Sequence, residues 1–220
     1  MTTRRSVILG AALWLGAAAL PAVPALAQDT VDLSVLAQEN PLGDIALGQA
    51  DAPVTVIEYG SLSCPHCAAF DVNGLPVIQQ RYIDTGIVRY IYRDYPLEPY
   101  AMAGAMLARC LPQDRFYGMI HALFSRRDEW LLQNQDAAIA GLTRIAIDNG
   151  HTEASFESCL ADQSVYDAIT FQMDQADQLG LTGTPTFFIN GERVVGEATQ
   201  PVIDAIERHR NDATPSVVRK

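Results

Sequence analysis

The chain has 220 residues, of which 49% are hydrophobic and 19% are charged, and its formal net charge is -11 at pH 7. This composition is typical of a globular protein, because disordered chains are less apolar and multi-span membrane proteins carry fewer charges. The acidic excess disfavours nucleic acid and anionic lipid as partners, since both need a basic surface that neutralises phosphates. We therefore expect no nucleic-acid partner.

Residues 1–27 have the features of a secretory signal peptide. Arg4 and Arg5 give a positive start, residues 7–20 form an uninterrupted apolar run, and residues 25–27 (Ala-Leu-Ala) supply a cleavage sequence. The apolar run is too short to span a bilayer comfortably as an anchor. The sequence thus predicts export, and the paired arginines leave the twin-arginine route open beside ordinary secretion.

A strand–helix–strand unit follows a weakly patterned lead-in, residues 28–52. Residues 54–57 (Val-Thr-Val-Ile) are a β-branched run typical of a buried strand, residues 64–84 have a helical pattern, and residues 88–92 form a second strand pattern. This order predicts a βαβ unit with two parallel strands and a right-handed crossover.

A helical segment, residues 98–181, separates this unit from the last predicted strands. One apolar helix face in it repeats at the helical period, and it consists of Phe116, Met119, Ile120, Leu123 and Phe124. Together with the preceding unit, residues 53–97, this pattern predicts a helical insertion in an α/β fold.

The second half of the sheet is predicted in residues 182–210. Residues 186–189 (Thr-Phe-Phe-Ile) form a strand pattern, Asn190-Gly191 is a hairpin signal, and residues 193–195 form the return strand. A helix from residue 199 to about 210 closes the fold, and the polar residues 211–220 are expected to be a flexible tail.

The segment Cys64-Pro65-His66-Cys67 directly follows the first strand and opens the first helix. The first amide N–H groups of a helix lack intrahelical partners and carry the positive end of its dipole, so they stabilise a thiolate at Cys64. Pro65 suits the first helical position, and a protonated His66 adds positive charge beside the sulfur. Such surroundings lower the pKa of a cysteine from ~8.5 to roughly 3.5–7.5. We expect an exposed, acidic Cys64 and a shielded Cys67.

Other uses of a Cys-x-x-Cys pair fit this sequence less well. A zinc site normally needs a second ligand pair at similar spacing, and the sequence has none. Covalent haem attachment needs a histidine directly after the second cysteine, where Ala68 stands. An inert structural disulfide stays open, since exported proteins retain disulfides. The position between strand and helix favours a redox-active dithiol and no metal site.

Three further segments accompany the Cys64–Cys67 pair. They are Glu58 shortly before it, residues 92–97 (Tyr-Arg-Asp-Tyr-Pro-Leu) and residues 183–191 (Gly-Thr-Pro-Thr-Phe-Phe-Ile-Asn-Gly). Together the four segments resemble the thioredoxin superfamily and, within it, the DsbA-like thiol–disulfide oxidoreductases. The Pro-His dipeptide between the cysteines is similar to that of DsbA, whereas thioredoxin has Gly-Pro and isomerases commonly have Gly-His or Gly-Tyr.

The resemblance implies a thioredoxin-like fold whose two halves flank a helical subdomain. It implies that Cys64 forms the mixed disulfide with the substrate and that Cys67 resolves it, with Pro65 and His66 as part of the catalytic segment. It also implies folding exported polypeptides as substrates, a periplasmic location and a DsbB-like, quinone-linked membrane protein as re-oxidant. No cofactor is expected beyond the redox-active disulfide itself.

The resemblance adds three site candidates. Pro185 matches the family's cis-proline, where a cis X–Pro bond makes a tight turn beside the sulfurs. Thr184 would offer backbone groups to an extended substrate peptide; several isomerases have threonine here, whereas DsbA-type oxidases often have valine. Glu58 matches the acidic residue under the active site, and burial beneath Cys67 would raise its pKa and let it relay the proton of that thiol. A solvated glutamate at the strand end is the alternative.

Cys110 and Cys159 lie in the helical segment, each on an apolar helix face. An even number of cysteines in an exported protein favours a structural disulfide between them. Two buried free thiols are the alternative. The other pairings would consume Cys64 and Cys67 and are disfavoured.

We therefore predict a monomeric, exported oxidase that introduces disulfides into secreted polypeptides. A disulfide isomerase or reductase that dimerises through residues 28–52 is one alternative, although this segment is short for a separate dimerisation domain. A metal-handling or chaperone-like module that uses the thiols as ligands for Cu(I) is the alternative of another class. His121 lies beside the apolar helix face and is expected to pack there rather than to act in catalysis.

Overall fold

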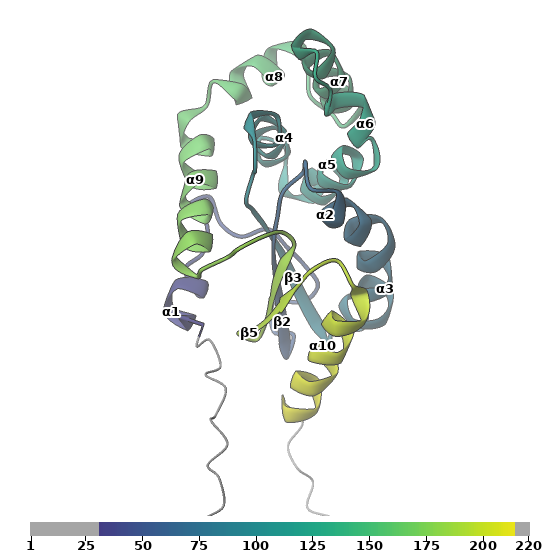
Figure 1. Ribbon diagram of the computed structural model, residues 1–220, viewed down its shortest axis with the longest axis vertical. Helices are drawn as coiled ribbons and strands as arrows, with labels where there is room; N and C mark the ends of the chain where they lie inside the picture. Colours follow the sequence, from purple (N-terminus) through teal and green to yellow (C-terminus); the bar gives the residue numbers. More distant parts are fainter. Residues whose placement is uncertain (1–30, 214–220) are drawn as a thin grey trace, which may run out of the picture. The chain divides into compact units, whose positions relative to one another are not determined.

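The strands of residues 31–213, the part of the chain that the computed structural model describes, form one mixed sheet in the order β1-β3-β2-β4-β5 (Figure 1). The predicted signal peptide and residues 214–220 of the predicted tail lie outside these residues. The strands are β1 (Ala46–Leu47), β2 (Val54–Gly60), β3 (Val88–Asp94), β4 (Thr186–Ile189) and β5 (Glu192–Val195).

The predicted βαβ unit is confirmed. β2 and β3 pair in parallel, with Val54 opposite Val88 and Gly60 opposite Asp94. The crossover is a continuous helical run rather than one regular helix, because two π-helical segments, η1 and η2, interrupt it. Its parts are α2 (Pro65–Ala69), η1 (Phe70–Gly74), α3 (Leu75–Ile78) and η2 (Gln79–Ile83). Single π-helical turns are rare and occur frequently at functional sites.

The helical insertion between the two halves of the sheet is also confirmed. It consists of α4 (Pro99–Arg109), α5 (Gln113–Ser125), α6 (Arg127–Trp130), α7 (Gln135–Asp148), α8 (Glu153–Leu160) and α9 (Gln163–Gln178). The predicted apolar stripe of α5 is buried, as are the inner faces of its neighbours. No helix in the described part of the chain is long and apolar enough to cross a bilayer.

The C-terminal half matches the predicted hairpin. β4 and β5 are antiparallel, and Asn190 and Gly191 between them have φ angles of 45° and 94°, values that suit a tight turn. α10 (Thr199–Ala213) extends three residues beyond the expected end at 210, so residues 211–213 belong to a helix rather than to a tail.

The lead-in contains two short elements that the sequence pattern does not predict. α1 (Leu33–Leu36) begins at the capping residue Asp32, and β1 pairs antiparallel with β3 at the sheet edge. An element of two to four residues contains too few side chains to show a period, so only tertiary contacts identify it.

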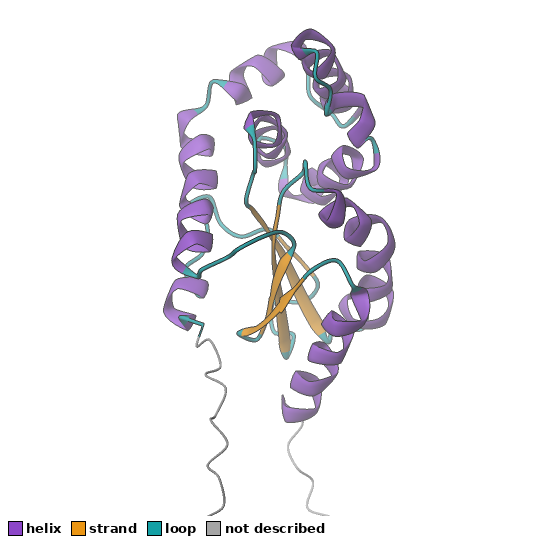
Figure 2. Cartoon of the chain, viewed as in Figure 1, coloured by secondary structure: helices purple, strands orange, loops and turns teal. Residues whose placement is uncertain are grey.

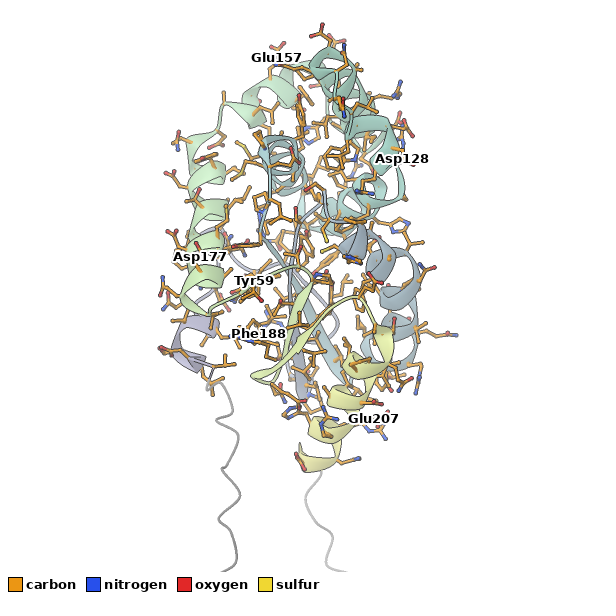
Figure 3. The ribbon with its side chains drawn as sticks, viewed as in Figure 1. Tyr59, Asp128, Glu157, Asp177, Phe188 and Glu207 are labelled. Carbon is orange, nitrogen blue, oxygen red and sulfur yellow. A yellow bond between two sulfur atoms is a disulfide. The ribbon has the colours of Figure 1, made fainter. Side chains whose placement is uncertain are left out.

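Helices cover both faces of the sheet (Figure 2). The helical run after β2 and α10 pack on one face, which carries Val54, Val56 and Phe187. α1 and α9 pack on the other face, where Tyr59 and Phe188 contact each other edge to face (Figure 3). Because β2 lies in the centre of the sheet, a residue at its end is surrounded by protein on both faces and flanked by β3 and β4.

Candidate active site

The Cys64–Cys67 pair lies where β2 passes into the crossover helix. Cys64 is the N-cap of α2, and Pro65 occupies the first turn, as the sequence predicts. The Cys64 thiol donates a hydrogen bond to the backbone oxygen of Thr184 at 3.3 Å. Cys64 is only 6% exposed and Cys67 is fully buried, so the expectation of an exposed Cys64 was wrong. The Thr184 segment covers the sulfur that the helix end alone would leave open.

The two thiols differ sharply in acidity. The pKa of Cys64 is lowered from 9.0 to about 5, above all by the hydrogen bond from the Cys67 thiol, then by the Thr184 side chain and by the backbone N–H groups of Cys67 and His66. Burial opposes this shift but does not cancel it. The pKa of Cys67 is raised far above its ordinary value, first by burial, then by its hydrogen bond to Cys64 and the charge of Glu58. At neutral pH the pair therefore holds one thiolate, at Cys64.

Glu58 points from the middle of the sheet into the core beneath the cysteines. It is 2% exposed, and one of its carboxyl oxygens accepts a short hydrogen bond from the hydroxyl group of Tyr90 on β3. Burial raises the pKa of Glu58 to about 8, against the lowering effect of the Tyr90 hydrogen bond. A carboxyl with this pKa can accept and donate a proton near neutral pH. The sequence pattern does not identify Tyr90 as its partner, because only strand register brings the two together.

Pro185 closes the site from the opposite side. The Thr184–Pro185 peptide bond is cis, and Pro185 is buried directly before β4. Because β4 pairs antiparallel with β2, the loop that precedes β4 lies at the same end of the sheet as the residues that follow β2. This pairing brings Thr184 to Cys64 across 120 positions of the sequence.

The His66 side chain does not lie where the sequence argument expects its charge to act. Its ring pairs with the carboxylate of Glu197 beyond β5, and the side chain is 62% exposed. The backbone N–H of His66, rather than its ring, is among the groups that lower the pKa of Cys64. Glu197 carries no sequence signal, since a single glutamate after a hairpin is typical of solvent-exposed turns.

The structure joins Cys110 and Cys159 in a disulfide with a Cα–Cα distance of 5.9 Å. The bond links the C-terminal end of α4 to α8 within the insertion. It closes a loop between two positions that are 49 residues apart in the sequence.

The expectation that His121 packs against the apolar stripe was wrong. Its side chain is 57% exposed, and Nδ1 lies 2.7 Å from Oδ2 of the buried Asp71. His151 is a buried histidine that bonds to the backbone of α4, and His209 pairs with Glu192. No cluster of three or more His, Cys, Asp or Glu side chains placed for a metal ion occurs within residues 31–213.

A cysteine pair at a strand–helix junction, opposite a cis-proline on a sheet of this topology, defines a thioredoxin-fold protein with a redox-active site. The thioredoxin family model matches residues 40–206, which is most of the chain. The protein therefore belongs to the thioredoxin family, and its solved relatives place it among the DsbA-like thiol–disulfide oxidoreductases.

Among solved structures, alpha-DsbA1 of Wolbachia pipientis is 32% identical, with a TM-score of 0.72 over 77% of this chain and 92% of that chain. Oxidised BdbD of Bacillus subtilis is 21% identical, with a TM-score of 0.69 over 76% and 93%, and supports the fold alone. A Rickettsia bellii protein, provisionally named a protein-disulfide oxidoreductase, is 28% identical over 75% of this chain. The match spans 64% of that relative, somewhat less than two thirds of its length.

Proposed function

We propose that this protein is an exported oxidase that introduces disulfide bonds into secreted polypeptides. The observation that carries the proposal is the asymmetry of one cysteine pair, in which the pKa of Cys64 falls to about 5 while that of Cys67 rises. A stabilised Cys64 thiolate favours the reduced dithiol, and a disulfide whose reduced form is stabilised is a strong oxidant.

The reaction begins when a substrate thiolate attacks Cys64 of the Cys64–Cys67 disulfide. The disulfide breaks, a mixed disulfide forms between the substrate and Cys64, and Cys67 leaves with the electron pair and takes up a proton. The second substrate thiolate then attacks the substrate sulfur of the mixed disulfide and releases Cys64 as a thiolate. The substrate loses two electrons and gains a disulfide, and the enzyme pair is reduced.

Extended polypeptides are the proposed substrates. The backbone of Thr184 faces Cys64, so a substrate strand that pairs with this segment would place its sulfur at the attacked atom. This use of backbone groups tolerates many sequences, which suits an enzyme that acts on folding chains in the periplasm. We propose that the enzyme acts as a monomer and is re-oxidised by a DsbB-like, quinone-linked membrane protein, without a bound cofactor.

Two activities compared in solution test the direction of the reaction. The proposal predicts a monomer that rapidly oxidises a reduced two-cysteine peptide and poorly rescues a scrambled multi-disulfide protein. A stable dimer that rescues the scrambled protein well and oxidises the peptide slowly would favour the isomerase that Thr184 suggests. Tight stoichiometric Cu(I) binding without peptide oxidation would favour a metal-handling module.

A further inference from the structure

A second acidic group lies on the helix that carries Cys67. Asp71 is one turn further along, inside the π-helical segment η1, and is 7% exposed. Residues one turn apart on a helix are surface neighbours, so Asp71 lies on the side of the helix that Cys67 presents to the core. Burial raises the pKa of Asp71, and its contact with His121 opposes that shift. The mechanism described above makes no use of this carboxyl.

Asp71 interacts electrostatically with a polar cluster inside the apolar core, which Glu58, Tyr90 and Tyr92 form. The charge of Asp71 raises the pKa values of Glu58, Tyr90 and Tyr92. The Tyr92 hydroxyl is buried and has no hydrogen-bond partner among the described residues. A methyl group placed on Gly60 would lie 3.1 Å from that hydroxyl and 3.1 Å from Glu58 Oε1, so both oxygens lie next to Gly60.

Asp71 also borders a pocket at the protein surface. Asp71 and His121 both line a surface pocket of about 370 Å³, together with Tyr117. His121 Nδ1 contacts Asp71 Oδ2, while the ring itself is largely exposed. Asp71 therefore contacts an exposed imidazole at the surface, while its charge acts on the buried groups around Glu58.

A proton route to solvent matters because Cys67 and Glu58 are both buried. Each catalytic cycle delivers a proton to Cys67 when the disulfide is reduced and removes it when the disulfide is re-formed. We propose that Asp71 and His121 conduct this proton between the Glu58–Cys67 site and solvent in the pocket. The inference rests on the proposed thiol–disulfide exchange and assigns Asp71 and His121 as proton-conducting residues.

The transfer balances in both directions. When Cys67 leaves as a thiolate, protonated Glu58 donates its proton to the sulfur, and Glu58 regains one from solvent through His121 and Asp71. During re-oxidation the proton moves from Cys67 to Glu58 and out along the same groups. Histidine suits the outer position because it exchanges protons near neutral pH.

The groups that face this route come from several elements. Glu58 lies on β2, Tyr90 and Tyr92 on β3, and Tyr117 and His121 on α5. The tyrosines have raised pKa values and remain neutral near pH 7, so they do not gain or lose protons there.

Reduction of the oxidised protein by dithiothreitol, followed at increasing buffer concentration, tests the proposal. In dilute buffer, His121→Gln and Asp71→Asn should slow the reaction roughly tenfold, below the roughly 10²–10⁴-fold that a positioned acid or base contributes. Added imidazole should restore the His121→Gln rate, while the redox equilibrium with glutathione stays unchanged. His209→Gln is the matched control, because His209 also pairs with a carboxylate but lies on α10.

Equal rates for the wild-type protein and both variants in dilute buffer would overturn the route. A slow His121→Gln variant that imidazole does not rescue, with a shifted glutathione equilibrium, would overturn it as well, since that result indicates a structural role. Failure of thiol–disulfide exchange itself is distinguishable, because the wild-type protein would then not react at Cys64. His121 is exposed, so its variant keeps the test available if Asp71→Asn does not fold.

Discussion

Cys64 and Cys67 lie within one helix turn after the C-terminal end of the central strand β2, whereas Cys110 and Cys159 join two helices of the insertion across 49 positions. In the first pair, the mutual hydrogen bond, the Thr184 side chain and nearby backbone amides lower the pKa of Cys64, whereas burial and the charge of Glu58 raise that of Cys67. The second pair closes a long loop, which restricts the unfolded chain. The groups around the sulfurs therefore decide the role of each pair: the Cys64–Cys67 pair is reactive, and the Cys110–Cys159 disulfide stabilises the fold.

The largest expected effect on disulfide exchange comes from replacing one sulfur atom of the Cys64–Cys67 pair with oxygen. Cys64→Ser should abolish disulfide exchange, because Cys64 is the sulfur that substrates attack. In Cys67→Ser the Cys64 thiolate should attack a peptide disulfide, form a mixed disulfide and release the other peptide thiol, and this mixed disulfide should accumulate because no Cys67 thiol is present to break it. Non-reducing electrophoresis with a disulfide-bonded peptide measures both results. Equal accumulation of the mixed disulfide in the two variants would contradict the assignment.

The buried Glu58 near the Cys64–Cys67 pair should make the free energy of unfolding depend on pH. The pKa of Glu58 rises from an ordinary 4.5 to about 8 on folding, so the folded state retains a proton that the unfolded chain loses between these values. Its contribution to stability is therefore complete below the lower value and is lost as the pH rises through the higher one. At about 1.4 kcal/mol per pKa unit, the loss is on the order of 5 kcal/mol.

Glu58→Gln should remove this decline, so the variant should gain stability relative to the wild-type protein between pH 5 and pH 8. Urea unfolding of the oxidised proteins measures the difference, because the Cys64 and Cys67 thiols do not titrate in that form. Glu157→Gln is the control, since Glu157 is exposed on the insertion (Figure 3). A parallel decline in the Glu58→Gln protein would show that another group is responsible.

The second pair should act on stability alone. Replacing both Cys110 and Cys159 with alanine should lower the free energy of unfolding by about 2–4 kcal/mol, as expected for a disulfide that closes a long loop. Exchange at Cys64 should persist at a temperature where the variant is folded. Denaturant unfolding and peptide oxidation on the same sample measure the two effects. Loss of exchange in a folded sample would mean that the two pairs are coupled.

The smallest effect concerns His66. Its exposed ring pairs with Glu197, and exposed ion pairs contribute little, so His66→Gln should raise the pKa of Cys64 by less than about 1 unit. Glu197→Gln should lower it slightly, because a negative charge near the sulfur is removed. Thiolate absorbance against pH measures both shifts. A change of several units in the His66 variant would restore the sequence interpretation, in which the ring dominates.

The local parts of this site follow from the sequence, and the long-range parts do not. The β-branched run of β2 and the Cys-x-x-Cys segment predict the junction and the acidic sulfur, because helix-end electrostatics act within a few residues. The cis peptide bond at Pro185 came only from family resemblance. Tyr90 reaches Glu58 through strand register, and Glu197 reaches His66 from the chain that follows β5; no local pattern encodes either contact. The exposure of His121 was mispredicted because the sequence pattern of the apolar face of α5 does not show whether a residue beside that face is buried or exposed.

The function proposed for the Cys64–Cys67 pair requires that the reduced pair holds a single, acidic thiolate. The measurement is the thiolate absorbance of the reduced protein against pH, with Cys110 and Cys159 left bridged. The account predicts one thiolate per molecule with a midpoint of about 5, assigned to Cys64 by its loss in Cys64→Ser, and no second midpoint until the solution is strongly alkaline. A midpoint near the ordinary value of ~8.5, or two thiols that titrate together there, would contradict it.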